Sequence, residues 1–144
     1  MNKPMRVAAV VVTYNRVALL QQCLRALEEQ TMPLTAIWVI DNASTDGTAD
    51  TVSAMGLENL IYRNTGRNLG GAGGFAYGIR EAAEKGYDAL WVMDDDTIPE
   101  RAALECLVQA DENLQGDYGW LSSRALAPDG TDQPMNRQRA TPYR

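Results

Sequence analysis

Four short apolar runs alternate with segments of helical spacing along this sequence, and this alternation limits the fold more than any other feature. The runs are rich in Val, Ile, Leu and Ala, as expected for strands that are buried on both faces, and they span residues 6–14, 36–42, 59–64 and 89–94. Helices are predicted for the segments between and after them, residues 16–30, 44–55, 74–86 and 99–113. Strands joined through helices form right-handed units with parallel strands. We therefore predict an α/β fold with a mostly parallel sheet flanked by helices.

The expected ends of three helices follow from local capping signals. Either Ser44 or Asp46 can accept a hydrogen bond from the first turn of the second helix. Gly86 is placed to end the third helix in the left-handed conformation that glycine adopts easily. Pro99 is expected in the first turn of the fourth helix, where its missing N–H costs nothing.

Length and composition are those of a single globular domain. The chain has 144 residues, which is enough for one core. Its formal net charge is −6 and it contains no histidine, so no nucleic-acid partner is expected. Cys23 and Cys106 have no metal-ligand spacing, and we expect free thiols in a reducing, cytoplasmic setting. No apolar run approaches the roughly 20 residues of a membrane span, and the first residues do not resemble a signal peptide.

Polar residues follow every predicted strand. In an α/β sheet ligands bind beyond the carboxyl ends of the strands, where the connecting loops converge. The residues at these ends are Thr13, Tyr14, Asn15 and Arg16 after the first strand, Asp41 and Asn42 after the second, Asn64, Arg67 and Asn68 after the third, and Asp94, Asp95 and Asp96 after the fourth. Four polar strand ends at one edge predict a binding site there.

Three consecutive aspartates end the fourth strand, although like charges repel and carboxylates resist burial. A helix cap by Asp96 or Thr97 would explain one acid and not three. In an extended chain Asp94 and Asp96 point to the same side. Two carboxylates on one side suit a hard divalent cation that keeps water or phosphate oxygens in its other positions. We favour a metal–diphosphate site over a helix cap.

The glycine-rich stretch "GAGGFA" at residues 71–76 fits the G-x-G-x-x-A fingerprint of nicotinamide dinucleotide sites, with Asp94 downstream as the acid for the ribose. That fingerprint should follow the first strand of its unit in a tight turn, whereas here it follows the third. A simpler interpretation is that the glycines let the backbone pass close to a bulky ligand, and that a helix beginning at Gly73 and Gly74 faces negative charge. A nicotinamide-dependent oxidoreductase remains a less favoured alternative.

The sequence also resembles a known family. The stretches "VVVTYNR", "IWVIDNASTDGTAD", "NLGGAGGFAYGIREA" and "LWVMDDD" occur in the order seen in the amino-terminal half of family 2 glycosyltransferases with the GT-A fold. The resemblance covers residues 7–99, and "GGAGGF" with an acidic triplet is most similar to the galactofuranosyl- and rhamnosyltransferase-like branch. It implies a Rossmann-like sheet, with a nucleotide-sugar-binding half at residues 1–122 and a polar loop or tail at residues 123–144, where a truncated acceptor half would start.

The resemblance implies an inverting transfer of a sugar from a UDP- or dTDP-sugar to a hydroxyl of a glycan or lipid-linked acceptor, assisted by Mg²⁺ or Mn²⁺. It assigns Asp94 and Asp96 to the metal, and Asp41 to the imide N–H of uracil or thymine. The other donor-binding residues that it implies are Thr13 and Tyr14 beside the nucleoside, Asn15, Arg67, Asn68 and Gly71, and Asp95, which faces the ribose or the sugar.

Family members usually continue beyond this point with an acceptor pocket and a general base, and no residue here matches that base. We therefore expect the chain to hold the donor half alone, as a fragment or as a naturally short protein, and to be inactive or weakly active by itself. A non-catalytic nucleotide-sugar-binding domain is the main alternative. An open sheet edge further predicts a homo-oligomer, and a lipid-linked acceptor predicts peripheral contact with the inner face of the membrane.

Overall fold

The computed structural model describes residues 4–134. Its contacts divide the chain into two compact units, Met1–Glu105 and Cys106–Arg144. The functional boundary expected at residue 122 stays a prediction, and residues 135–144 of the predicted tail lie outside the described residues.

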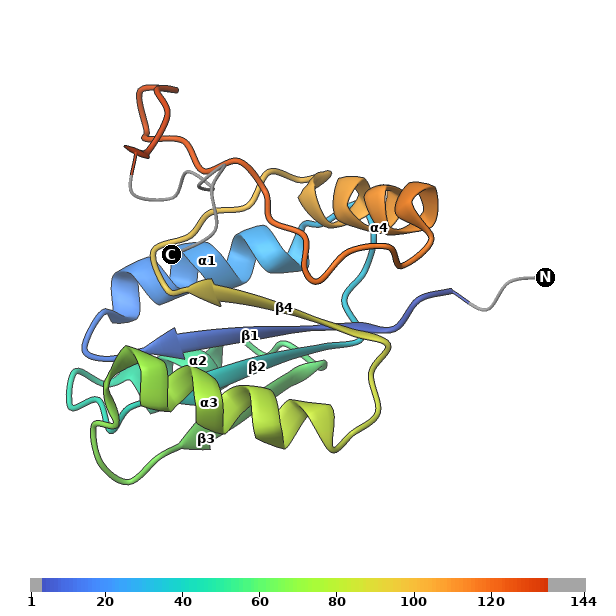
Figure 1. Cartoon of the computed structure of the whole chain (residues 1–144). Coiled ribbons are helices and arrows are strands. Elements are labelled where there is room, and N and C mark those ends of the chain that lie inside the picture. Colours follow the sequence, from blue (N-terminus) through green and yellow to red (C-terminus); the bar gives the residue numbers. More distant parts are fainter. Residues whose placement is uncertain (1–3, 135–144) are drawn as a thin grey trace, which may run out of the picture. The chain divides into compact units, whose positions relative to one another are not determined.

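The first unit is built on a four-stranded parallel sheet with the strand order β3-β2-β1-β4 (Figure 1). The strands are β1 (Val7–Thr13), β2 (Ala36–Asp41), β3 (Leu60–Asn64) and β4 (Ala89–Asp94). Each agrees with one of the predicted strands to within one residue at either end. The expected α/β fold is therefore confirmed, and all four carboxyl ends lie along one edge of the sheet.

Helices cover both faces of this sheet. Helix α3 (Gly70–Ala83) packs against one face, and α1 (Val17–Glu28) and α2 (Thr48–Ala54) lie together on the other (Figure 1). Because both faces are covered, β1 and β2 are buried over their whole length. The edge strands β3 and β4 are only partly buried. This difference explains why the two central strands carry the most continuous apolar runs.

The core has one layer on each side of the sheet. Under α3, alternate residues of the central strands pack with Ala82 and with the half-buried Phe75; these are Ala8, Val10, Val12, Ala36, Trp38 and Ile40. On the opposite side, α1 contributes four buried residues at helical spacing, Leu20, Cys23, Leu24 and Leu27. The period of two in the strands and of three to four in the helix is the pattern that predicted these elements.

The glycine-rich stretch has a different role from the expected one. Helix α3 already begins at Gly70, so Gly73 and Gly74 lie inside the helix and do not form its N-terminus. A Cβ atom on Gly74 would lie 2.6 Å from Cγ1 of Val12, and one on Gly78 would lie 2.6 Å from Cγ1 of Ile40. These glycines let α3 approach the sheet closely, and this packing explains them without a ligand.

Two expected helix starts are also corrected. The N-cap residue of α2 is Gly47, at φ 79°, so neither Ser44 nor Asp46 takes the N-cap position. Asp46 still contacts the first turn, because its Oδ1 accepts a 2.5 Å hydrogen bond from the hydroxyl of Thr48, the first residue of α2. Helix α4 is Ala103–Leu114 and begins four residues after Pro99. The buried Gln30 side chain accepts a 3.1 Å hydrogen bond from Leu104 N–H and donates one of 2.9 Å to the carbonyl of Glu100. The first N–H groups of a helix have no acceptor within the helix. Here the distant Gln30 side chain accepts from one of them, Leu104 N–H, which favours a helix start at this position.

The second unit contains most of α4 and the polar segment that follows it. An isolated antiparallel bridge joins Leu126 and Asp132, and Arg124 forms a 2.6 Å ion pair with the same aspartate. The Tyr118 hydroxyl donates a hydrogen bond to Asp111. The polar loop or tail is predicted for residues 123–144; its described part, residues 123–134, contains turns and the isolated bridge.

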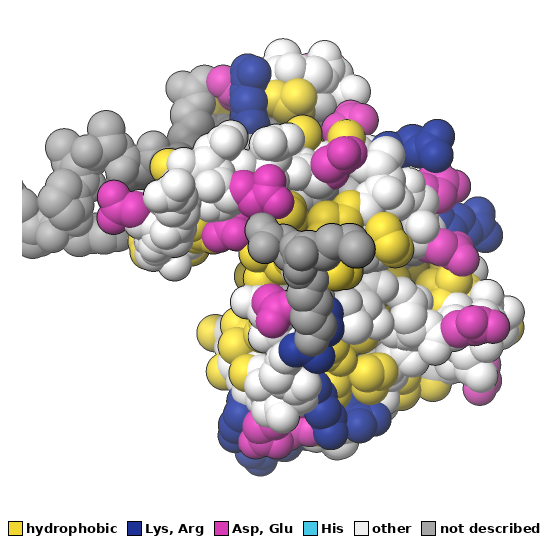
Figure 2. Space-filling view, turned by 90° about the vertical axis from the view of Figure 1, so that its right-hand side faces the viewer, with side chains coloured by type: hydrophobic (Ala, Val, Ile, Leu, Met, Phe, Trp, Pro, Cys, Tyr) yellow, Lys and Arg dark blue, Asp and Glu magenta, His cyan; other side chains and the backbone are white. Residues whose placement is uncertain are grey.

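The amino-terminal edge of the sheet carries charges of both signs. Arg6 and Asp88 form a 3.5 Å ion pair there. Figure 2 views the molecule from this side and shows acidic and basic side chains interspersed. The acidic strand ends described next lie at the opposite edge.

Candidate functional site

The parallel register brings the polar strand ends together. Thr13 at the end of β1 lies beside Asp41 at the end of β2, and Asp94 at the end of β4 lies beside Val12. Residues that are far apart in the sequence thus meet at one edge, as predicted. The three strands β2, β1 and β4 are direct neighbours, so their ends form a continuous row.

Asp95 is the buried member of the acidic triplet. It is 3% exposed, and one of its carboxylate oxygens, Oδ2, accepts a 2.8 Å hydrogen bond from the Thr13 hydroxyl. Burial raises the pKa of Asp95 above its usual value, while the Thr13 hydrogen bond and the Arg16 charge act in the opposite direction. Asp95 therefore ties β4 to β1, and its predicted contact with the ribose or sugar stays a prediction.

Arg16 is the cation that the acidic triplet requires, and no sequence motif assigned it a role. Its Nη1 atom lies 3.3 Å from Oδ1 of Asp95 and 3.1 Å from Oδ2 of Asp96. The only signal in the sequence was its position among the polar residues after the first strand. The guanidinium offsets part of the repulsion between the neighbouring carboxylates.

Asp94 and Asp96 are the exposed members of the triplet. The chain turns at Asp95 and Asp96, and Thr97 N–H donates a 3.2 Å hydrogen bond to the carbonyl of Asp94. The prediction that Asp94 and Asp96 share one side assumed an extended chain, so that reasoning was wrong for this turn. Among residues 4–134 no three His, Cys, Asp or Glu side chains group closely enough to hold a metal ion. Two exposed carboxylates still suit a hard cation that takes its other ligands from water or phosphate.

Asp41 is an almost fully buried carboxylate, 1% exposed, with both oxygens engaged. Oδ1 accepts a 2.8 Å hydrogen bond from Ser44 N–H, and Oδ2 accepts a 2.5 Å hydrogen bond from the Tyr62 hydroxyl. Burial and the Asp41 carboxylate raise the pKa of Tyr62 to about 12, so the phenol stays protonated and keeps donating. Tyr62 was missed because it lies within the third strand, not beyond it.

Asn15 joins the loops that follow β1 and β2. Its side-chain oxygen accepts a 2.7 Å hydrogen bond from Thr45 N–H, and its own N–H donates one of 2.8 Å to Ser44 Oγ. Its φ of 51° lies in the left-handed region, which Asn tolerates better than most residues. Asn15 therefore fixes the loop after β1 against the loop after β2. The neighbouring Tyr14 is 44% exposed and open to a ligand.

The loop after β3 and the first turn of α3 carry three further predicted residues at the same edge. Arg67, Asn68 and Gly71 are all exposed. The Arg67 carbonyl accepts a 2.7 Å hydrogen bond from the Thr65 hydroxyl, and Oδ1 of Asn68 accepts one of 2.8 Å from Gly70 N–H. A Cβ atom at Gly71 would meet nothing within 4 Å. The loop is ordered by its own hydrogen bonds and leaves the Arg67 side chain accessible.

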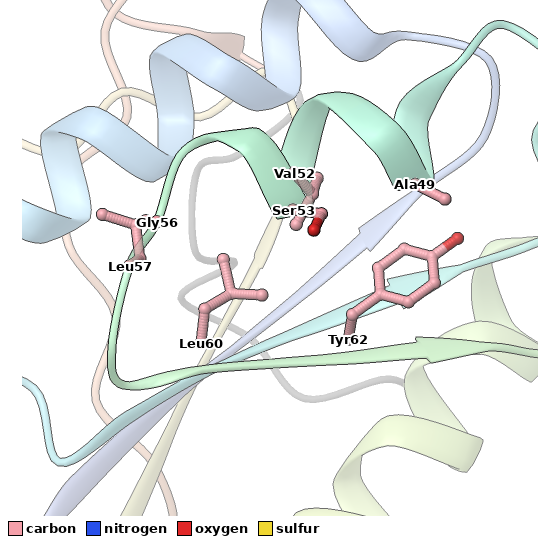
Figure 3. Close-up of a pocket in the computed structure, with 7 residues that line it drawn as sticks. All are labelled: Ala49, Val52, Ser53, Gly56, Leu57, Leu60 and Tyr62. Atoms are coloured by element: carbon pink, nitrogen blue, oxygen red, sulfur yellow. The ribbon is translucent and has the colours of Figure 1, made fainter.

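A pocket of about 340 Å³ lies between α2 and β3 (Figure 3). Its lining is mainly apolar and comprises Ala49, Val52, Ser53, Gly56, Leu57, Leu60 and Tyr62. The Tyr62 ring borders the pocket on the side of Ala49 (Figure 3). Its hydroxyl donates the hydrogen bond to Asp41.

Comparison with known proteins decides the family. Residues 8–139 match the sequence pattern described as glycosyl transferase family 2. The chain belongs to this family. The match extends over most of the chain, which confirms the resemblance seen in the four motifs. It also favours a glycosyltransferase over the nicotinamide-dependent oxidoreductase.

Two curated relatives have comparable similarity. Galactofuranosyltransferase GlfT1 of Mycolicibacterium smegmatis is 39% identical over 93 residues, which are 65% of this chain and 30% of that protein. Undecaprenyl-phosphate mannosyltransferase of Micrococcus luteus is 34% identical over 110 residues, 74% of this chain and 44% of the relative. The chain thus spans less than half the length of either relative. The galactofuranosyltransferase match confirms the expected resemblance to that branch of the family.

A solved structure supports the GT-A fold. Mannosyltransferase PcManGT from Pyrobaculum calidifontis, in complex with GDP-Man and Mn²⁺, superposes with a TM-score of 0.62 at 27% identity. The similarity covers 74% of this chain and 32% of that one. Within residues 4–134, no helix has both the length and the apolar character needed to cross a membrane.

Proposed function

We propose that this chain binds a UDP- or dTDP-sugar together with Mg²⁺ or Mn²⁺, as the donor half of an inverting glycosyltransferase. The observation that carries the proposal is the row of strand ends, in which the exposed Asp94 ends β4, the exposed Asp96 follows it in the next turn, and the buried Asp41 ends β2. A family 2 member needs sites for a diphosphate and a nucleoside, and this row offers candidates for both.

Asp94 and Asp96 would hold the metal, with the donor diphosphate completing its ligands. Two carboxylates are the usual protein share of a Mg²⁺ site that also binds phosphates. When bound, the cation stabilises the negative charge that the departing diphosphate gains. The Mn²⁺ and GDP-Man in the P. calidifontis enzyme support such a pairing of metal and nucleotide sugar.

Asp41 would recognise the nucleobase. Each carboxylate oxygen has two lone pairs, so an oxygen that already accepts one hydrogen bond can accept another from an imide N–H. Uracil and thymine carry that group, which favours a UDP- or dTDP-sugar. Thr13, Tyr14 and Asn15 would border the nucleoside, and Arg67, Asn68 and Gly71 would lie along the donor on the other side. Asp95 would face the ribose or sugar through Oδ1, the oxygen that contacts Arg16 and not Thr13.

The acceptor would be a glycan or a lipid-linked sugar. The name of the M. luteus relative includes a lipid phosphate, which supports a lipid-linked acceptor. Such an acceptor would bring the chain into contact with the inner face of the membrane. Transfer with inversion needs a general base that takes the proton of the acceptor hydroxyl on the face opposite the diphosphate. No described residue is assigned to that step, so donor binding is the property to test first.

Calorimetric titration tests this proposal. UDP, dTDP and GDP are titrated into the chain with Mn²⁺ and with a chelator, and the series is repeated on Asp94→Asn/Asp96→Asn. We expect UDP or dTDP to bind in a Mn²⁺-dependent manner, more tightly than GDP, and the double variant to lose the Mn²⁺-dependent part.

A matched control is Glu28→Gln/Glu29→Gln, which also removes two negative charges. These residues lie at the carboxyl end of α1, near the amino-terminal edge of the sheet and away from the candidate site (Figure 1). The control should bind like the wild type. Binding by GDP alone would overturn the assignment of Asp41 to an imide. No nucleotide binding by folded protein under any condition would overturn the proposed function as a whole.

A further inference from the structure

Arg16 contacts the acidic triplet with a single guanidinium nitrogen. Its Nη1 atom reaches Asp95 at 3.3 Å and Asp96 at 3.1 Å. The two partners differ in exposure, because the Asp95 side chain is 4% exposed while the Asp96 side chain is 53% exposed. The contact joins the start of α1 to the end of β4, which lie at the same edge of the sheet (Figure 1).

This contact conflicts with a metal on Asp96. A divalent cation binds carboxylate oxygen at about 2.0–2.6 Å. It would share the Asp96 carboxylate with the Arg16 guanidinium, and the two cations would repel each other at short range. The Arg16 side chain is 51% exposed, so it is free to move toward solvent or toward another anion. Asp95, in contrast, is held by the Thr13 hydroxyl and stays in place.

We propose that Arg16 couples metal binding to diphosphate binding at this site. Without nucleotide, Arg16 pairs with Asp96 and competes with the metal. When a metal–diphosphate complex binds, the guanidinium leaves Asp96 and pairs with the added phosphate charge, because arginine binds phosphate oxygens well. The diphosphate thus removes the competitor and supplies metal ligands at the same time. This inference rests on the proposed function.

The expected consequence is a coupling free energy between two ligands. Mn²⁺ alone binds the protein weakly, and UDP raises the affinity of the protein for Mn²⁺. This increase has two sources, the phosphate ligands that UDP supplies and the removal of Arg16 from Asp96. Linkage requires that Mn²⁺ raise the affinity for UDP by the same factor. Removing the Arg16 charge should strengthen the binding of Mn²⁺ alone and reduce this factor.

The experiment measures Mn²⁺ binding by the loss of the free-ion signal in electron paramagnetic resonance, with and without UDP. The variants are Arg16→Gln, Arg16→Lys and the control Arg25→Gln, which removes an exposed positive charge from the last turn of α1. We expect Arg16→Gln to bind Mn²⁺ alone about two- to fivefold more tightly, the range of a partly exposed ion pair. Its enhancement by UDP should fall by at least the same factor. Arg16→Lys should lie between wild type and Arg16→Gln, and Arg25→Gln should match wild type.

The outcomes separate this inference from the proposed function. If wild type binds Mn²⁺ with UDP but Arg16→Gln binds Mn²⁺ alone no more tightly than wild type, the coupling role of Arg16 is wrong and the donor site stands. The coupling role is equally wrong if the enhancement by UDP is unchanged in Arg16→Gln. If folded wild type binds no Mn²⁺ with or without UDP, the proposed metal site is overturned and this inference with it.

Discussion

The Thr13 hydroxyl donates a 2.8 Å hydrogen bond to the carboxylate of Asp95, and both side chains are almost fully buried. The bond links the end of β1 to the turn after β4 at the edge where the candidate donor residues gather. The expected contribution of such a bond is large, because a buried carboxylate oxygen that loses its partner pays a desolvation penalty.

Thr13→Val should therefore destabilise the protein by about 1–3 kcal/mol, since valine has the same shape but no hydroxyl. Urea unfolding followed by tryptophan fluorescence measures this change. Thr13→Ser keeps the donor and should lose clearly less stability. Equal losses in the two variants would show that the methyl group matters and the hydrogen bond does not.

Tyr62→Phe tests the second buried carboxylate. The variant keeps the ring beside the α2–β3 pocket and removes only the hydroxyl that Asp41 accepts from. We expect a loss of about 1–3 kcal/mol in the free energy of unfolding, because Oδ2 of Asp41 is left buried without this donor. Tyr77→Phe is the control, since no hydrogen bond from its hydroxyl is seen within residues 4–134. A neutral Tyr62→Phe would argue against a structural role for this hydrogen bond.

Gly78→Ala tests the close approach of α3 to the sheet. The new Cβ atom would lie 2.6 Å from Cγ1 of Ile40 and 2.8 Å from Cγ1 of Val10, both on buried strands. Overpacking of this kind costs about 1–3 kcal/mol, partly offset by the better helix propensity of alanine, worth about 1 kcal/mol. We expect a lower midpoint of thermal unfolding.

The control for this substitution is Gly71→Ala in the same helix, where a Cβ atom would meet nothing within 4 Å. This variant should be neutral or slightly more stable than wild type. Similar effects of the two substitutions would mean that helix propensity, and not the contact with the sheet, determines the outcome.

Cys23 should make stability fall at high pH. Burial raises the pKa of its thiol from 9.0 to about 12, with Asp95 and Asp96 adding to the shift. Well below pH 9 both the folded and the unfolded state keep the proton, so this thiol contributes no pH dependence. Between pH 9 and 12 the unfolded state releases its proton first, and the free energy of unfolding falls as the pH rises.

The measurement compares the free energies of unfolding of wild type and Cys23→Ala at several pH values from 7 upward. The free energy of unfolding of wild type relative to Cys23→Ala should be constant well below pH 9. Above pH 9 it should decrease, because only wild type carries the thiol that the unfolded state ionises first. A constant difference at all pH values would show that the thiol titrates alike in both states.

Much of the fold could be predicted from the sequence because its signals are local. The alternation of apolar strands and amphipathic helices indicated the type and order of the elements, and parallel pairing then placed Thr13, Asp41 and Asp94 at one edge. Helix ends were less predictable, because the start of α4 depends on Gln30, 74 residues from Leu104.

The amino-acid sequence was sufficient to predict the α/β fold, the polar strand ends with their acidic triplet, and the family. How those groups pair is visible only in the folded chain. Folding buries Asp95 against Thr13, 82 residues away, places Arg16 between Asp95 and Asp96, and joins Tyr62 to Asp41. It also brings α3 so close to the sheet that Gly74 and Gly78 are needed for packing. The physical reason is that periodicity is encoded in neighbouring residues, whereas hydrogen bonds and close packing depend on atoms that only folding brings together.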